Sequence, residues 1–342
     1  MPTLRVQAAG LVTPLGGSFR TTCAAVRAGV RNVTRTNIFD RPTASFISAG
    51  QVSLHQWWEG PEIIPDLLAP AIEECFDAAH PLRPEQIPII LGLPGRDRRG
   101  RAGGLDESVL PAVAERLGFR LHPRSSIVFG GHVSACLALR EGRRLAEFDG
   151  IRTFIAAAVD TLVRRVTINA YLEQSRVLTP GNSNGFAPAE GAGAILVTAS
   201  GNVPGLEVLG IGLARENATI ESEEPFRAEG MTQAVRLCLE EAGIGMEDVS
   251  YRITDLNGER YKFKEATITF SRLLTKSATR DIGIWHPIDC VGEVGAAIGP
   301  LAFALALHAS EHGYAPGDTA LLHFSNDGGE RAAVVTRFVN GA

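Results

Sequence analysis

Short apolar runs alternate with amphipathic segments along the whole chain. The apolar runs predict buried strands at residues 4–9, 88–93, 127–129, 151–159, 191–198, 206–214, 248–254, 319–324 and 332–338. Helical spacing of apolar residues predicts helices at 21–28, 66–79, 105–117, 133–147, 232–242, 265–274 and 295–309. Strands that are apolar on both faces need helices on both sides. The pattern therefore predicts an α/β protein with largely buried sheets.

One piece of the pattern occurs twice. A glycine-rich turn, an acid and a strand of small apolar residues occur at 185–198 (GFAPAEGAGAILVT) and again at 324–337 (FSNDGGERAAVVTR). Between them, the turn formers of 199–205 (ASGNVPG) indicate a linker. We therefore expect two related halves, residues 1–200 and 201–342.

Composition removes several classes of function. The 342 residues carry a net charge of −5. The single dense basic run, RDRRGR at 96–101, is typical of a solvated loop. We therefore expect no nucleic-acid partner. No apolar run reaches the ~20 residues that span a bilayer, and no signal peptide is evident, so we expect a cytoplasmic protein without a membrane partner. The five scattered cysteines indicate reduced thiols.

The stretch GGHVSACLAL, at 130–139, has the form of a turn into a buried helix that would present a nucleophile. His132 stands at the apex of that turn. Cys136 follows one helical turn later, in apolar surroundings typical of a buried core thiol.

Several motifs, taken in order, resemble the β-ketoacyl synthase branch of the thiolase fold. They are AAGLVTPLG at 8–16, AAAVDT at 156–161, SNGFAPAEGAGAILV at 183–197, GAA at 295–297 and FSNDGG at 324–329. The resemblance covers most of the chain. It implies two pseudo-repeated βαβ halves that form α-β-α-β-α layers.

The resemblance also implies where a catalytic site would lie. The family's cysteine, two histidines and lysine fall on His132, Asn257, Gly292 and Pro287. Condensation needs a thiolate and two hydrogen-bond donors that stabilise the enolate. This set provides no thiolate, and Gly292 has no side chain. The resemblance therefore implies a degenerate synthase-like chain, for which we assign no catalytic residue and expect no cofactor.

Other residues could rebuild a site. Cys290 could act as a displaced nucleophile, with His286 or His132 as its base. The pairs His132/Cys136 and His286/Cys290 would approach one cavity in this fold. A zinc site there is disfavoured, because Cys136 should point into the helix packing and Pro287 stiffens the second pair. We therefore predict no metal.

The resemblance places residues 324–329 along the family's acyl pocket. The expected pocket-lining residues are Phe186, Phe324, Asn326 and Asp327, and the two phenylalanines could block an acyl tunnel. Three carboxylates, Asp289, Glu293 and Asp327, should lie near the same place as loop caps.

The stretch NGERYKFKEA, at 257–266, is charged and aromatic where the family has a catalytic loop. We interpret it as an exposed loop that enters a helix. Its Arg260, Tyr261 and Lys262 could anchor a protein partner.

Three classes of function remain. The first is a non-catalytic scaffold, adaptor or chaperone, a homodimer or pseudo-heterodimer through the sheet edge. The resemblance associates such chains with bacterial type VI secretion effectors and with polyketide pathways, where a chain that lacks the cysteine pairs with an active synthase. The second is an atypical acyltransferase of the 3-oxoacyl-ACP synthase type that uses Cys290 or His132. The third is a pocket that senses an acyl chain without turning it over.

Overall fold

A computed structural model describes residues 2–54, 60–199, 203–274 and 282–341. Within these ranges the main sheet has ten strands. Their order is β10 (Gly283–Trp285), β9 (Tyr251–Thr254), β11 (Thr319–Ser325), β12 (Glu330–Val339), β8 (Gly205–Arg215), β1 (Leu4–Val12), β7 (Glu190–Ala199), β6 (Thr153–Thr161), β4 (Ile89–Leu93) and β5 (Ser126–Phe129).

The strand order repeats itself. In the first half, the pairs β1-β7 and β7-β6 are antiparallel, and the pairs β6-β4 and β4-β5 are parallel. The second half has the same order of pairings in the series β8-β12-β11-β9-β10. The halves join where residues 4–6 of β1 pair with residues 206–208 of β8. The two similar sequence segments become β7 and β12, which hold equivalent places. The boundary at residue 200 lies outside the described residues and stays a prediction.

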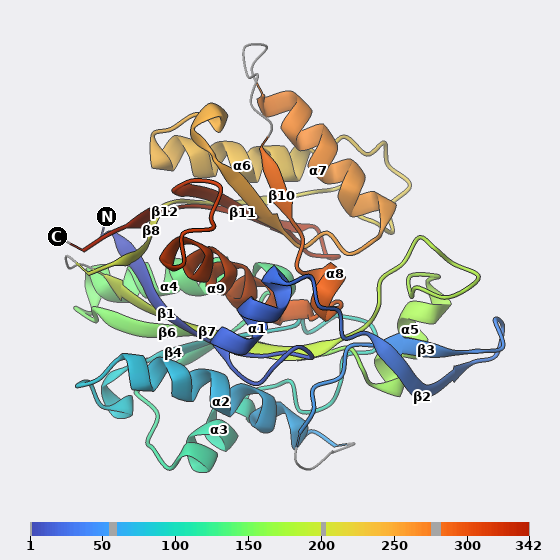
Figure 1. Ribbon diagram of the computed structural model, residues 1–342, viewed down its shortest axis with the longest axis horizontal. Helices are drawn as coiled ribbons and strands as arrows, with labels where there is room; N and C mark the ends of the chain where they lie inside the picture. Colours follow the sequence, from blue (N-terminus) through green and yellow to red (C-terminus); the bar gives the residue numbers. More distant parts are fainter. Residues whose placement is uncertain (1, 55–59, 200–202, 275–281, 342) are drawn as a thin grey trace.

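Helices form three layers around the two half-sheets (Figure 1). The central layer holds α4 (Ser134–Phe148) and α9 (Ile298–Glu311), and every residue of α9 from Ile298 to Ala309 is buried. One outer layer holds α2 (Ile63–Ala78) and α3 (Val109–Leu117), and the other holds α6 (Glu229–Ala242) and α7 (Arg260–Leu273). The predicted α-β-α-β-α architecture is confirmed, and covered sheets explain the continuous apolar strands.

Three smaller elements flank the layers: α1 (Phe19–Arg27), α5 (Arg165–Glu173) and α8 (Ile288–Val291). The strands β2 (Thr34–Asp40) and β3 (Ser45–Ala49) form a separate hairpin. The sequence pattern did not predict the hairpin or α5, because both mix polar and apolar residues outside the main layers.

Two predicted helix starts are wrong by more than three residues. Helix α3 begins at Val109 instead of 105, and α7 begins at Arg260 instead of 265. The supposed exposed loop at 257–266 is therefore largely helix. Its charged residues hid a buried helical face, which includes Lys262, Glu265 and Ala266. None of the helices in the described ranges is long and apolar enough to cross a membrane.

Candidate functional site

His132 lies where β5 meets α4. After Phe129 the chain makes a tight turn, and residues 131–133 form a short 3₁₀ helix that leads into α4. Gly131 has φ +52°, and a Cβ there would lie 2.5 Å from Oδ1 of Asn326. Glycine is therefore needed just before His132, and the turn directs the imidazole to the junction between the two halves.

Both ring nitrogens of His132 face acceptors. Nδ1 lies 3.0 Å from Oδ2 of Asp255 and 3.0 Å from the carbonyl oxygen of Ser325. Nε2 lies 3.1 Å from Oε1 of Glu293. The Nζ atom of Lys262 lies 3.0 Å from Nδ1 and donates to Asp255 at 2.7 Å.

These contacts continue into a larger group of side chains. Asn257 donates to Glu293 at 2.8 Å and to Glu259 at 3.0 Å. Arg176 pairs with Glu259 and with Asp327, each at 2.7 Å. We call the whole group the interior network. Its members are His132, Arg176, Asp255, Asn257, Glu259, Lys262, Glu293 and Asp327.

The interior network favours charged side chains. Burial and Lys262 lower the pKa of His132, but Glu293 and Asp255 outweigh them and raise it to about 9. Burial raises the pKa of Asp255, but Lys262 and His132 outweigh burial and hold it far below its usual range. Burial also raises the pKa of Glu293, but His132 and Lys262 outweigh burial and lower it. The raised pKa favours the imidazolium form of His132, in which both ring nitrogens donate. Lys262 then donates to Asp255 at 2.7 Å and to the carbonyl oxygen of Ser325 at 3.3 Å.

A cavity of about 280 Å³ opens beside the network. Of the four predicted pocket residues, Phe186, Asn326 and Asp327 line it together with His132. Phe324 does not line this cavity: its side chain is fully buried in the central core, because it points from β11 towards the middle helix layer.

Part of the basic run at 96–101 also reaches this cavity. Arg98 and Arg99 line it, and Arg98 pairs with the buried Asp160 at 2.6 Å. The side chain of Arg98 is only 15% exposed. The prediction of a wholly solvated loop is therefore wrong for Arg98.

The surface role predicted for Lys262 is wrong. Its side chain is 4% exposed and belongs to the interior network. Tyr261 is half-buried, donates to the carbonyl of Ala218 and accepts from Arg331, both at 2.8 Å. Arg260 is exposed. Helical spacing offered a signal for Lys262, because residues 262, 266 and 269 share the buried face of α7.

The remaining residues matched to the family have structural roles. Gly292 ends α8 with φ +83°, and a Cβ there would lie 2.7 Å from Cβ of Ala189. Pro287 precedes the first turn of α8. Neither residue contributes a polar side chain to the interior network.

The expectation that His286 and Cys290 approach the cavity of His132 is not met. They line a separate cavity of about 430 Å³, together with Trp285 and Tyr314. His286 lies 2.9 Å from Asp289, and burial raises the pKa of the half-buried Cys290 thiol. Of the three predicted carboxylates, Glu293 and Asp327 line the cavity of His132, whereas Asp289 lies with Cys290.

Cys136 is fully buried, and burial raises the pKa of its thiol. Among the described residues, no three His, Cys, Asp or Glu side chains are arranged to hold a metal ion.

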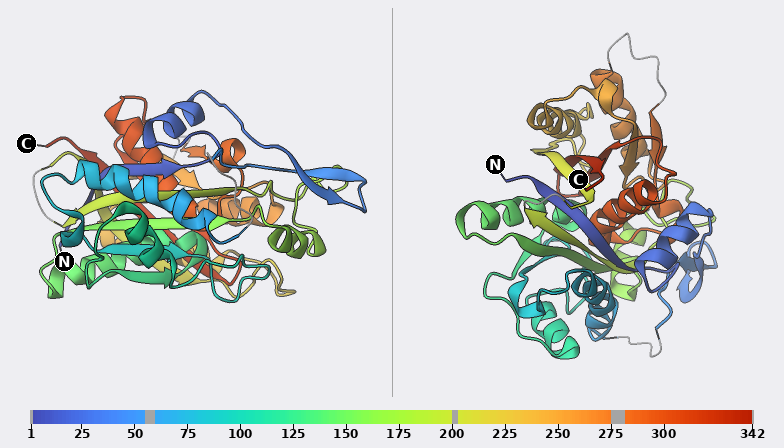
Figure 2. Two further views of the ribbon diagram at one scale, coloured as in Figure 1. Left: turned by 90° about the horizontal axis from the view of Figure 1, so that it is seen from below. Right: turned by 60° about the vertical axis from the view of Figure 1, so that its left-hand side comes forward.

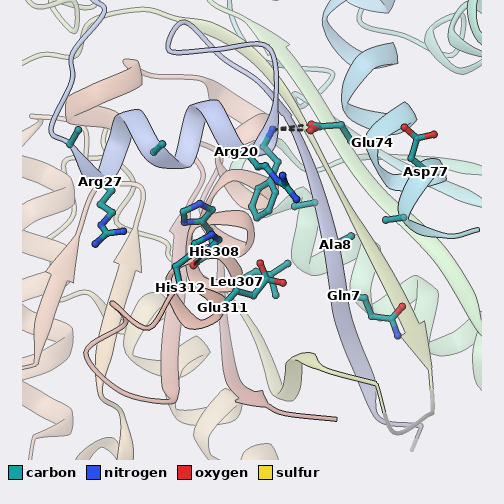
Figure 3. A pocket seen from close by; sticks show the side chains of 15 residues that line it. Gln7, Ala8, Arg20, Arg27, Glu74, Asp77, Leu307, His308, Glu311 and His312 are labelled. Atoms are coloured by element: carbon teal, nitrogen blue, oxygen red, sulfur yellow. Dashed lines mark hydrogen bonds between the residues drawn. The ribbon is translucent and has the colours of Figure 1, made fainter.

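A larger groove, of about 1190 Å³, lies between α1, α2, α9 and β1 (Figure 3). Glu74 accepts a hydrogen bond from the backbone of Phe19 at 2.9 Å, and the rings of His308 and His312 stack at 3.9 Å. None of the residues predicted for the site lines this groove. The candidate site is therefore the cavity at His132, which is smaller but contains the buried charges.

Three residues of the site were missed in the sequence. Asp255 and Glu259 flank Asn257 at the end of β9 and the start of α7, and Arg176 follows α5. Two acids that flank Asn257 directly after a predicted strand were a usable signal. Arg176 offered none, because its partners lie 83 and 151 residues away.

No protein-family model and no curated protein sequence matches the chain significantly. Solved structures do match its fold. The ishigamide ketosynthase/chain length factor is 18% identical, with a TM-score of 0.71 over 99% of this chain and 100% of that one. The ketosynthase ApeO with its chain length factor ApeC from Xenorhabdus doucetiae is 14% identical, with a TM-score of 0.73 over 99% and 98%.

A ketosynthase in complex with its type II PKS acyl-carrier protein, AntDE:AntF, is 15% identical, with a TM-score of 0.77 over 99% of this chain and 100% of that one. Identities this low describe architecture and leave activity open. With the repeated strand order and the central helices α4 and α9, they show that this chain has the thiolase-like fold of the ketosynthases.

Proposed function

We propose that this chain is a ketosynthase-like protein that carries out no condensation and acts by binding a protein partner, as a scaffold, adaptor or chaperone. One observation carries the proposal. His132, at the position where the family resemblance implies the nucleophile, is held on both ring nitrogens by Asp255, Ser325 and Glu293.

A nucleophile or a general base needs a free lone pair. The neighbouring carboxylates raise the pKa of His132 to about 9, which favours protons on both ring nitrogens at neutral pH. Acyl transfer to it would require breaking the contact with Glu293 or with Asp255. Charged groups such as Arg176 and Asp327 line the adjoining cavity, which disfavours an apolar acyl chain.

The alternative is an acyltransferase that uses Cys290 or His132. Cys290 lies in another cavity, and burial raises the pKa of its thiol, so little reactive thiolate forms at neutral pH. The structure therefore favours the binding role over an acyl-enzyme role.

Two of the similar structures contain a ketosynthase with a chain length factor. This supports pairing of the present chain with a second ketosynthase-like chain or with a copy of itself. We place that contact at the edge strand β5, which ends three residues before His132. A type VI secretion effector as a further partner remains a prediction from the sequence resemblance.

Intact-mass spectrometry after incubation with acetyl-, malonyl- and longer acyl-thioesters tests the proposal. We expect no acyl adduct on the wild type, on His132→Ala or on Cys290→Ala. An adduct on the wild type that is lost in one of the variants would identify a nucleophile and overturn the proposal.

A further inference from the structure

The hairpin of β2 and β3 projects from the body of the molecule (Figures 1 and 2). Burial alternates along both strands, as it does in a strand pair with one covered face. We call the hairpin, residues 34–49, the arm. The inward-facing residues are Thr36, Ile38, Asp40, Ile47 and Ala49.

The inner face of the arm is anchored beside the candidate site. Ile38 and Ile47 share a small apolar core with Tyr171 and Phe186, and both of these aromatic residues also line the cavity of His132. The rings of Tyr171 and Phe186 meet edge to face at 5.0 Å. The arm is therefore held by packing, and its outer face keeps a defined orientation.

The outer face carries an exposed aromatic pair. Phe39 and Phe46 lie directly opposite each other on the two strands, 47% and 37% exposed. Their ring centroids are 5.1 Å apart in an edge-to-face arrangement. The guanidinium of Arg35 lies 3.9 Å above the ring of Phe46. Aromatic and arginine side chains are enriched at protein interfaces.

The charge of the arm has one sign at its surface. Arg35 and Arg41 are exposed, whereas the single acid of residues 34–49, Asp40, is 6% exposed and accepts a hydrogen bond from Thr43. The chain as a whole has a net charge of −5, so this basic and aromatic face stands out against an acidic protein.

We propose that the outer face of the arm docks a protein partner whose surface is acidic and carries an exposed apolar side chain. Carboxylates of the partner pair with Arg35 and Arg41, and its apolar side chain packs on Phe39 and Phe46. The inference rests on the proposed function, since it names the surface through which a binding protein of this kind recognises its partner.

Selection from a phage-displayed library of random dodecapeptides on the full-length protein tests the docking surface. We expect peptides that combine Asp or Glu with an aromatic residue or leucine. In fluorescence polarisation, Phe39→Ser/Phe46→Ser and Arg35→Glu/Arg41→Glu should each weaken these peptides by about tenfold or more. Added salt should also weaken them.

Matched controls alter the same residue types elsewhere. Phe148→Ser changes a phenylalanine that is 73% exposed at the end of α4, and Arg236→Glu reverses an exposed charge on α6. Both should bind the peptides as the wild type does. Failure to obtain peptides whose binding depends on the arm, or arm-dependent peptides without acidic residues, would overturn the docking surface. The mass-spectrometric test would still decide the non-catalytic role separately.

Discussion

At the residue scale, two carboxylates act on one imidazole. Histidine titrates near pH 6.5 in an unfolded chain. In the folded protein, burial and Lys262 are outweighed by Glu293 and Asp255, and the pKa of His132 rises to about 9. The folded state therefore binds this proton more tightly. The resulting stabilisation is complete below about pH 6.5 and is lost as the pH rises through about 9.

We therefore expect His132→Gln to lower the free energy of unfolding by about 3 kcal/mol at pH 6, and by much less at pH 10. Urea denaturation across this range measures the difference. His122→Gln is the control, because burial and Arg124 lower the pKa of His122, so its pH-dependent effect belongs at more acidic pH. A deficit in His132→Gln that does not change with pH would show that His132 is uncharged in the folded protein.

At the element scale, α7 has one face exposed to solvent and another that contacts the interior network. Lys262 is buried against Asp255 at 2.7 Å, while Lys264, two residues later, is exposed. Removal of Lys262 takes from Asp255 its ion-pair partner and leaves His132 as the cation in contact with Asp255 and Glu293. We expect Lys262→Met to cost about 3–5 kcal/mol of stability, and Lys264→Met to cost about 0.5 kcal/mol or less.

A double-mutant cycle with Asp255→Asn separates charge pairing from packing. Combined with Asp255→Asn, Lys262→Met should cost much less than it does alone, as thermal or urea unfolding would show. Additive losses would mean that Lys262 stabilises α7 through its aliphatic stem and that its pairing with Asp255 is unimportant.

The apolar elements of the fold were predictable from the sequence, whereas the contacts of the buried charges were not. Strands of the buried sheet and the helix α9 were predictable, because apolar residues continue through each of them. The place of His132 followed from the glycine turn before it. Local signals could mark Asp255 and Lys262, and Glu293 was expected near the site. Their contacts with His132 were not predictable, because each of the three residues lies more than 120 positions away from it in sequence.

At the scale of the whole molecule, the repeated half-sheets leave β5 at one end of the sheet and β10 at the other. An edge strand exposes unpaired backbone groups, and a second sheet edge can pair with them. The strand β5 leads directly through the glycine turn to His132. A partner strand at this edge would therefore bring a second copy of the fold close to the candidate site, in the two-fold arrangement that most homo-oligomers adopt.

We predict that the purified chain forms a dimer through β5. Sedimentation velocity should give twice the mass of one chain, and the backbone amides of Ser126–Phe129 should exchange hydrogen slowly at high protein concentration and faster on dilution. Residues of β10, Gly283–Trp285, provide the internal control, because their exchange should not change with concentration. Concentration-dependent protection at β10 instead of β5 would move the interface to the other end of the sheet. Equal exchange of the β5 amides at all concentrations, in a chain that sediments as a monomer, would refute self-association through this edge.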